Sequence, residues 1–231
     1  MLDLCSNEIK YRNIDKTMAQ HPYRMTVSGC SGTGKTYWLI KNLCQHKDSS
    51  FDRIIWCAPE YSLQQQKLKN FQKNMNNSVM FIDGLDTDKI DELLNNYCSK
   101  GCQTCLVLDD LMYEQNSYIN NLFTSGRHKN CSIIELTQRL FNSSKSRTNR
   151  LNTNYFVLFS FGDLLECSQL FRQINPLKYK EIIRAYQKIT DKKHHCMIID
   201  KNYHKLDVKN KKLLKFRDTV WDESIVNLSE Y

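Results

Sequence analysis

The sequence predicts an α/β fold, with a mostly parallel central sheet between layers of helices. The first observation behind this prediction is that short apolar runs alternate along the chain with segments whose apolar residues recur at helical spacing. Strands that alternate with helices in this way join through right-handed crossovers, so the helices cover both faces of the sheet. The second observation is size, because 231 residues with 41% hydrophobic content suffice for one such domain with a substantial core.

The expected strands are short apolar runs, several of which are closed by Pro, Gly or acidic residues. They occupy residues 23–28, 53–58, 79–82, 104–108, 131–138, 155–159 and 196–200, and the last of these is expected to end the sheet. The expected helices run from Pro59 to about residue 74 and over 36–47, 87–98, 114–125, 163–173 and 175–189. Asp163 with Glu166 forms a capping box for one helix, and Asn175 with Pro176 marks the start of the next.

The formal net charge of +8 is unevenly distributed along the chain. Residues 201–217 hold seven Lys or Arg and one acid, and residues 139–154 hold four Lys or Arg and no acid. Both a polyanionic partner and an ordinary solvated face remain open for these segments. No apolar run approaches the roughly 20 residues that span a bilayer, and Met1–Cys5 lack a basic signal segment. We therefore expect a protein of a cytosol-like compartment without a membrane partner.

The ten cysteines are expected to be reduced in such a compartment. Cys98, Cys102 and Cys105 resemble part of a zinc site, but Cys105 falls in an expected strand and no fourth ligand lies nearby in the sequence. The His-His-Cys segment at 194–196 could supply a fourth ligand only through the fold. Buried thiols are the favoured interpretation.

A phosphate-binding loop of the form G-x-x-x-x-G-K-[ST] follows the first expected strand. Its residues are Gly29, Cys30, Ser31, Gly32, Thr33, Gly34, Lys35 and Thr36. The glycines let consecutive N–H groups wrap a polyphosphate, and the following helix adds the positive end of its dipole. Lys35 can reach the β- and γ-phosphates and Thr36 can ligate Mg²⁺. A plain Gly-rich turn is the alternative, which the strand–loop–helix context disfavours.

Two acids end the expected strand Leu106–Leu108, and a glutamine ends the next strand. In phosphate-loop proteins an acid at this position lies beside Mg²⁺, which makes Asp109 the expected metal ligand. Asp110 points differently and is the candidate general base for an attacking water. The amide of Gln138 can contact both a γ-phosphate and a water. An ordinary turn at the acids and a backbone-satisfied Gln138 are the structural alternatives.

Arg147 and Arg150 follow in the polar stretch. A guanidinium stabilises the negatively charged transition state of phosphoryl transfer, and it can come from a neighbouring subunit. Surface arginines without such a role are the alternative.

These motifs, in this order, resemble the FtsK/HerA superfamily, and more narrowly the DNA-packaging ATPases of poxviruses, related large DNA viruses and virus-like transposons. The resemblance covers residues 23–162. It is carried by the phosphate loop, Leu-Val-Leu-Asp-Asp, Gly-Arg-His-Lys-Asn at 126–130 with Ser-Ile-Ile at 132–134, Thr137–Gln138, and Arg-Leu-Asn at 150–152 before the strand at 155–159. It implies a three-layer P-loop NTPase of the RecA/ASCE type. From the order of the elements along the chain, we expect domain limits of 1–22 for an N-terminal extension, 23–200 for the ATPase and 201–231 for a basic tail.

The resemblance also implies that the Gln138 strand lies between the phosphate-loop strand and the Asp109 strand, with Gln138 as the sensor of the γ-phosphate. Arg150, and after it Arg147, falls where the family carries an arginine that acts across a subunit interface. The implied assembly is a homo-oligomeric ring that uses ATP and Mg²⁺ to pull double-stranded DNA into a capsid through a capsid or portal-like protein. Its place would be the viral assembly site in the host cytoplasm or nucleus, or the virion.

Two other functions are compatible with the motifs. A small-molecule or nucleotide kinase would use the arginine-rich stretch as a lid, although the paired acids favour an attacking water. A nucleotide-gated virion assembly factor would bind ATP without contacting DNA. The physical argument for DNA is that a duplex presents dense phosphates, which a translocase holds through nonspecific Lys and Arg contacts.

Overall fold

A computed structural model of the chain describes residues 21–45, 51–75, 78–111, 117–141, 146–201, 213–217 and 223–227. The described strands form one sheet in the order β3-β2-β4-β5-β1-β6-β7-β8-β9. The strands are β1 (Arg24–Ser28), β2 (Arg53–Ala58), β3 (Val79–Asp83), β4 (Thr104–Asp109), β5 (Cys131–Thr137), β6 (Tyr155–Leu158), β7 (Cys196–Asp200), β8 (Leu213–Arg217) and β9 (Glu223–Asn227). Almost all of the predicted N-terminal extension lies outside the described residues.

The first six strands of the sheet, from β3 across to β6, pair in parallel. Strands β7, β8 and β9 follow β6, and each of these pairs is antiparallel. The helices are α2 (Lys35–Gln45), α3 (Glu60–Leu63), α4 (Gln66–Asn74), α5 (Thr87–Ser99), α6 (Ser117–Ser125), α7 (Ser146–Asn152), α8 (Leu164–Ile174) and α9 (Tyr179–Thr190), with a 3₁₀ turn η2 at Gly126–Lys129. The predicted α/β class with a mostly parallel sheet is confirmed.

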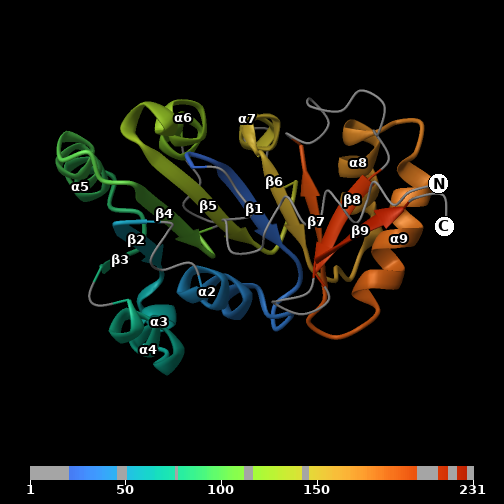
Figure 1. Cartoon of the computed structure of the whole chain (residues 1–231), viewed down its shortest axis with the longest axis horizontal. Coiled ribbons are helices and arrows are strands. Elements are labelled where there is room, and N and C mark those ends of the chain that lie inside the picture. The colour runs from blue at the N-terminus through green and yellow to red at the C-terminus, as the bar shows by residue number, and fades with distance from the viewer. Residues whose placement is uncertain are drawn as a thin grey trace, which may run out of the picture.

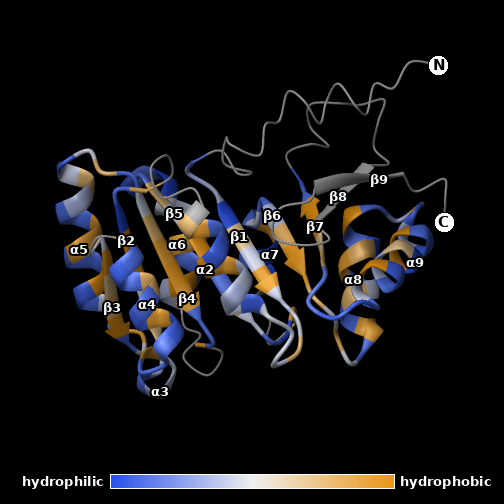
Figure 2. Cartoon of the chain, turned by 60° about the horizontal axis from the view of Figure 1, so that its bottom comes forward, coloured by the Kyte–Doolittle hydropathy of each residue, from blue (hydrophilic) through white to orange (hydrophobic). Residues whose placement is uncertain are grey.

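The sheet separates two helical layers, because alternate residues of each strand point to opposite faces. Helices α2 and α4 pack on one face, and α5, α6, α8 and α9 pack on the other (Figure 1). Strands β4, β6 and β7 are coloured largely hydrophobic in Figure 2, as expected for strands covered on both sides. At the centre, Trp56 is completely buried and its ring meets Phe71 of α4 edge-on at 5.6 Å. Each large side chain buried in this way contributes about 1.5–3 kcal/mol.

Several predicted element boundaries are wrong. The helix expected after Pro59 is divided into α3 and α4, because Gln65 adopts extended dihedral angles between them. Residues 146–152 form helix α7 within the polar stretch, where no helix was expected. Helix α9 begins at Tyr179, since Asn175 Oδ1 accepts from the Lys178 N–H at 3.1 Å and caps a turn before the helix.

Two further differences concern caps and the end of the sheet. Asp163 caps α8 by accepting from the Leu165 N–H at 2.8 Å, but Glu166 does not complete the capping box. Its carboxylate accepts instead from the Leu140 N–H at 2.6 Å. The strand at 196–200 is not the last, because β8 and β9 extend the sheet within the segment that was predicted to be a basic tail. Lysines within this segment hide the strands from sequence inspection.

Candidate active site

The order of three neighbouring strands brings the predicted site residues together. Strand β5 lies between β1 and β4 and is parallel to both, so the three strands end at the same edge of the sheet. In register, Ser28 is paired with Thr137, and Asp109 is paired with Leu136. The phosphate loop after β1, the acids at the end of β4 and Gln138 after β5 therefore converge on one place. The predicted position of the Gln138 strand is confirmed.

The phosphate loop is tightly held against β6. A Cβ atom on Gly29 would lie 2.7 Å from Cβ of Phe159, so only glycine fits at the start of the loop. Gly32 and Gly34 have φ angles of +75° and +102°, which L side chains rarely adopt. Helix α2 begins at Lys35, whose Nζ donates to the carbonyl oxygens of Gly29 at 2.6 Å and Cys30 at 2.8 Å. The lysine thus lies inside the curve of its own loop.

Segments distant in sequence also support the loop, and sequence inspection did not identify them. The Gly162 N–H donates to Sγ of Cys30 at 3.1 Å, and the Cys30 N–H donates to the Ser160 carbonyl at 3.0 Å. On the other side, Nδ1 of His194 lies 3.1 Å from the Thr33 carbonyl oxygen. These contacts fix the loop backbone between β6 and the turn that precedes β7.

Asp109 and Asp110 lie in different environments although they are adjacent. Asp109 is only 7% exposed. Burial raises its pKa to about 6, and the nearby positive charge of Lys67 opposes this rise. Asp110 is half-buried and has a φ angle of +58°, which is uncommon for a residue other than glycine. This left-handed conformation turns the second carboxylate toward Gln138, whose Nε2 donates to its two oxygens at 3.2 and 3.3 Å.

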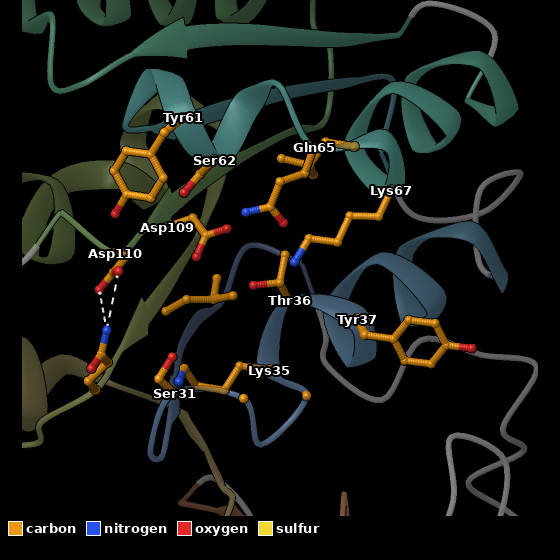
Figure 3. Close-up of a pocket in the computed structure, with 15 residues that line it drawn as sticks. Ser31, Lys35, Thr36, Tyr37, Tyr61, Ser62, Gln65, Lys67, Asp109 and Asp110 are labelled. Carbon is orange, nitrogen blue, oxygen red and sulfur yellow. Dashed lines mark hydrogen bonds between the residues drawn. The ribbon is translucent and has the colours of Figure 1, made fainter.

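These groups line one cavity of about 560 Å³. Its wall is formed by Ser31, Gly32, Gly34, Lys35, Thr36, Tyr37, Tyr61, Ser62, Gln65, Lys67, Leu68, Asp109, Asp110, Leu136 and Gln138. Figure 3 shows the phosphate loop and the residues of α3 and α4 on opposite sides of the cavity, with the two acids on a side between them. The α3–α4 wall was not predicted, because it comes from a polar helical segment without a motif.

The cavity suits a nucleotide and a divalent cation. Its volume falls in the usual range for ligand sites, and the loop at its floor has the backbone form that wraps phosphates. The Thr36 hydroxyl and the Asp109 carboxylate both face it, and these are oxygen ligands of the kind that Mg²⁺ prefers. Burial lowers the pKa of Lys35, whereas the carboxylates of Asp110 and Asp109 raise it, so the lysine and the acids act on each other across the cavity.

Arg147 and Arg150 do not line this cavity. Arg147 is exposed on α7. Arg150 is half-buried, its Nη1 donates to the Leu140 carbonyl at 3.0 Å, and its guanidinium lies 4.0 Å from the ring centroid of Phe141. The structure therefore brings the loop, the acids and Gln138 together within one chain, but not the two arginines.

The cysteines and the helices add two observations. Cys105 is buried in β4 while Cys98 and Cys102 are partly exposed, and no cluster of metal-ligating side chains occurs within the described residues. Across the same residues, no helix has both the length and the apolar character needed to cross a membrane.

Solved structures with the same architecture include two viral packaging proteins. The genome packaging NTPase B204 of Sulfolobus turreted icosahedral virus 2, in complex with AMP, aligns with a TM-score of 0.56 at 18% identity over 80% of this chain and 96% of that chain. B204 of Sulfolobus turreted icosahedral virus, a DNA-packaging ATPase, aligns with a TM-score of 0.59 at 15% identity over 80% and 95%. The pCW3 conjugation coupling protein TcpA, with ATPγS, gives 0.53 at 14% identity over 80% and 58%. At these identities the likeness establishes a shared fold.

Sequence comparisons give the family. No curated protein matches the chain. The model of the NB-ARC domain matches residues 7–160, which include the phosphate loop, the acid pair and Gln138. The predicted P-loop NTPase fold and ATPase class are confirmed by this match together with the shared architecture. The chain belongs to the NB-ARC domain family and is a P-loop ATPase.

Proposed function

We propose that this ATPase drives translocation of double-stranded DNA and packages a viral or virus-like genome, as a member of the FtsK/HerA group of motors. The observation that carries the proposal is the insertion of β5 between the phosphate-loop strand and the acid-bearing strand, which joins Gln138 to Asp110. The motif order in the sequence and the fold shared with B204, a DNA-packaging ATPase, add support.

The residues of the cavity have separate roles in hydrolysis. The loop N–H groups and Lys35 bind and orient the phosphates of ATP, and this orientation fixes the terminal phosphate toward the acids. Mg²⁺ held by Thr36 and Asp109 would neutralise charge on the β- and γ-phosphates. Asp110 is placed to accept the proton of an attacking water. The amide of Gln138 orients the Asp110 carboxylate through two hydrogen bonds, so a movement of the sensor also moves the base.

The pair of acids also bears on the kinase alternative. A kinase must hold a second substrate where the water would stand and exclude water from the terminal phosphate. Here a carboxylate that is fixed by Gln138 faces the cavity directly, which favours activation of water. The arginine-rich stretch does not line the cavity in the described residues, so it offers no lid within the chain.

Positive charge suited to a duplex lies on α9. Its buried face contains Ile182, Ala185, Tyr186 and Ile189. On its exposed face, Lys180, Arg184 and Lys188 recur at every fourth residue, so the three cations are neighbours along the helix. Lys192 and Lys193 follow in the exposed turn that leads to His194 and the phosphate loop. Such a row can contact successive backbone phosphates without reading bases.

The proposed partners follow from geometry. One small domain cannot encircle a duplex, so translocation requires a homo-oligomeric ring, in which Arg147 or Arg150 would reach a neighbour's ATP site. A packaging motor must also dock on a capsid or portal-like protein at the viral assembly site in the host cytoplasm or nucleus, or in the virion.

The proposal is tested by ATP hydrolysis with and without duplex DNA, at several protein concentrations and salt concentrations. We expect the rate to rise with DNA and with protein concentration, and the DNA effect to disappear at high salt. Ala substitution of Lys180, Arg184 and Lys188 together should reduce the stimulation, whereas Lys89→Ala in α5 together with Lys100→Ala directly after α5 should not. Slow hydrolysis that DNA leaves unchanged would favour the nucleotide-gated assembly factor. A phosphorylated small molecule in place of released phosphate would favour the kinase.

A further inference from the structure

One cation of the cavity has no role in the reaction described above. Lys67 lies in the first turn of α4 and lines the cavity opposite the phosphate loop. Figure 3 shows its side chain extending from α4 toward Thr36, with Asp109 and Gln65 nearby. Among the described residues the structure gives Lys67 no hydrogen bond and no ion pair. As far as the described residues go, all three N–H groups of this ammonium are available to a ligand in the cavity.

The neighbours of Lys67 indicate which end of the cavity it serves. Figure 3 shows its side chain directed toward Thr36 and near Asp109, the two residues whose oxygens suit Mg²⁺. Because Asp109 and Asp110 mark the end where the terminal phosphate would lie, Lys67 belongs to that end of the cavity.

We propose that Lys67 binds the terminal phosphate of the bound triphosphate and so makes the site distinguish ATP from ADP. The inference rests on the proposed ATP-hydrolysing function. The terminal phosphate carries more charge than the loop and Lys35 neutralise, and Lys67 approaches it from the wall opposite the loop. With ADP the same ammonium has no terminal phosphate to bind.

Because of the position of Lys67 in the fold, its contact with the terminal phosphate would connect two separate parts of the cavity wall. Its backbone belongs to the α3–α4 segment, which follows β2, whereas the loop follows β1 and packs against β6. A terminal phosphate bound by both Lys35 and Lys67 joins two separate parts of the cavity wall. Loss of that phosphate releases one of the two, so the α3–α4 wall reports the state of the nucleotide.

The test is binding of a nonhydrolysable ATP analogue and of ADP, each with Mg²⁺, measured by titration calorimetry. In Lys67→Met we expect affinity for the analogue to fall about tenfold, as for loss of one charge-assisted hydrogen bond, and affinity for ADP to change less than about twofold. Lys69→Met is the matched control, because Lys69 is exposed on the same helix and does not line the cavity. It should leave both affinities unchanged, and Lys67→Arg should recover part of the preference.

Four outcomes overturn the inference. Equal losses for the analogue and ADP would assign Lys67 to the inner phosphates, and unchanged affinities would make it a surface cation. Tighter binding of either Mg²⁺–nucleotide complex would mean that Lys67 competes with the metal for Asp109. If Lys67→Met melted at a lower temperature than Lys69→Met and kept the preference for the ATP analogue over ADP, the role of Lys67 would be in packing alone. If the unmodified protein binds neither nucleotide, the proposed function fails, whereas these outcomes leave it intact.

Discussion

The side-chain amide of Gln138 donates to both carboxylate oxygens of Asp110, at 3.2 Å to Oδ1 and 3.3 Å to Oδ2. The two residues follow neighbouring parallel strands, β5 and β4, and are separated by 28 positions in the sequence. The Asp110 backbone contributes to the arrangement, since its N–H donates to the Leu136 carbonyl at 3.1 Å. A residue in a strained left-handed conformation that is held by a neighbouring strand is typical of a functional site.

The first prediction concerns Asp110→Asn. Asparagine has the same shape and tolerates positive φ, so the backbone should keep its conformation and nucleotide binding should persist. Because the amide cannot accept the proton of water, turnover should fall by about a hundredfold or more. Release of phosphate at saturating ATP measures the effect, and binding of a fluorescent ATP analogue is the control. Turnover close to that of the unmodified enzyme would remove Asp110 as the base.

The second prediction uses Gln138→Glu, which puts a second carboxylate where the amide now contacts Asp110. Two carboxylates at hydrogen-bonding distance do not ionise independently, and each raises the pH at which the other loses its proton. The acid limb of the pH profile of turnover should therefore move to higher pH. Gln138→Leu is the matched control, because it removes the amide without adding charge, and it should lower turnover while moving the limb less than Gln138→Glu does. Identical profiles for Gln138→Glu and the unmodified enzyme would contradict the coupling.

The third prediction separates the two arginines of α7. Arg150→Ala removes the hydrogen bond to the Leu140 carbonyl and the contact with the Phe141 ring, so the free energy of unfolding should fall by about 1–3 kcal/mol. Arg147→Ala, at an exposed position of the same helix, should change it by less than about 0.5 kcal/mol. Urea unfolding of the two variants measures the difference. Equal losses in the two variants would show that the contacts of Arg150 within its own chain do not stabilise the fold more than those of Arg147.

Activity in mixtures of subunits then bears on the proposed ring and on the proposed role of these arginines in trans. An arginine that acts on a neighbour's ATP lowers turnover of unmodified subunits when the Ala variant is mixed with them. Because Arg147 is exposed, Arg147→Ala can show this effect without a loss of stability. If only Arg150→Ala lowers turnover in mixtures, Arg150 is the arginine that acts in trans. Its guanidinium must then leave the Leu140 carbonyl when the subunits assemble.

Local motifs in the sequence predicted one part of the site and missed another, for a physical reason. The loop from Gly29 to Thr36 is continuous in sequence, and the acids and Gln138 each end an apolar strand, so local patterns reveal them. The wall that contains Lys67 is different. It reaches the site only because β2 lies beside β4 in the sheet, and its own sequence is an unremarkable polar helix. A local sequence pattern cannot reveal this wall, because strand pairing between distant parts of the chain brings it to the site.

The same reasoning explains the support behind the loop and the extension of the sheet. His194 and Thr33 are 161 positions apart, and nothing in either local sequence indicates the contact. Strand β8 contains Lys215 and Arg217 and lies among further lysines, so its charge pointed to a solvated tail. Pairing with β7 outweighs that local preference, because a strand that joins an existing sheet satisfies its backbone hydrogen bonds.

The fourth prediction concerns Lys35→Ala. The ammonium lies within the loop, where it donates to two loop carbonyls and faces the acids, so its loss removes the charge that binds the phosphates. Affinity for ATP should fall by about a hundredfold or more, the loss expected for two charge-assisted hydrogen bonds. Lys41→Ala, on the same helix but outside the cavity wall, should bind normally. Binding measured with a fluorescent nucleotide checks both, and retained affinity in Lys35→Ala would place the nucleotide elsewhere.

The fifth prediction is that Asp109→Asn makes the nucleotide-free protein more stable while it prevents hydrolysis. Burial raises the pKa of Asp109 from 3.8 to about 6, so the folded state holds a proton that the unfolded state releases between these values. Below both values the carboxyl is neutral in either state and costs nothing. As the pH rises through this window stability falls, and above it the ionised carboxylate costs the folded state about 3 kcal/mol.

Removal of that charge should raise the free energy of unfolding by up to about 3 kcal/mol at pH 8, and the gain should nearly vanish at about pH 4. Urea unfolding at the two pH values measures it. Asp83→Asn is the matched control, since Asp83 likewise ends a strand of the sheet, β3, but is exposed, and its effect should be small at both values. A gain of equal size at both pH values would mean that better packing, and not the buried charge, stabilises the variant. Without metal or nucleotide the buried carboxylate weakens the fold, which favours a role for it in ligand binding over a role in stability.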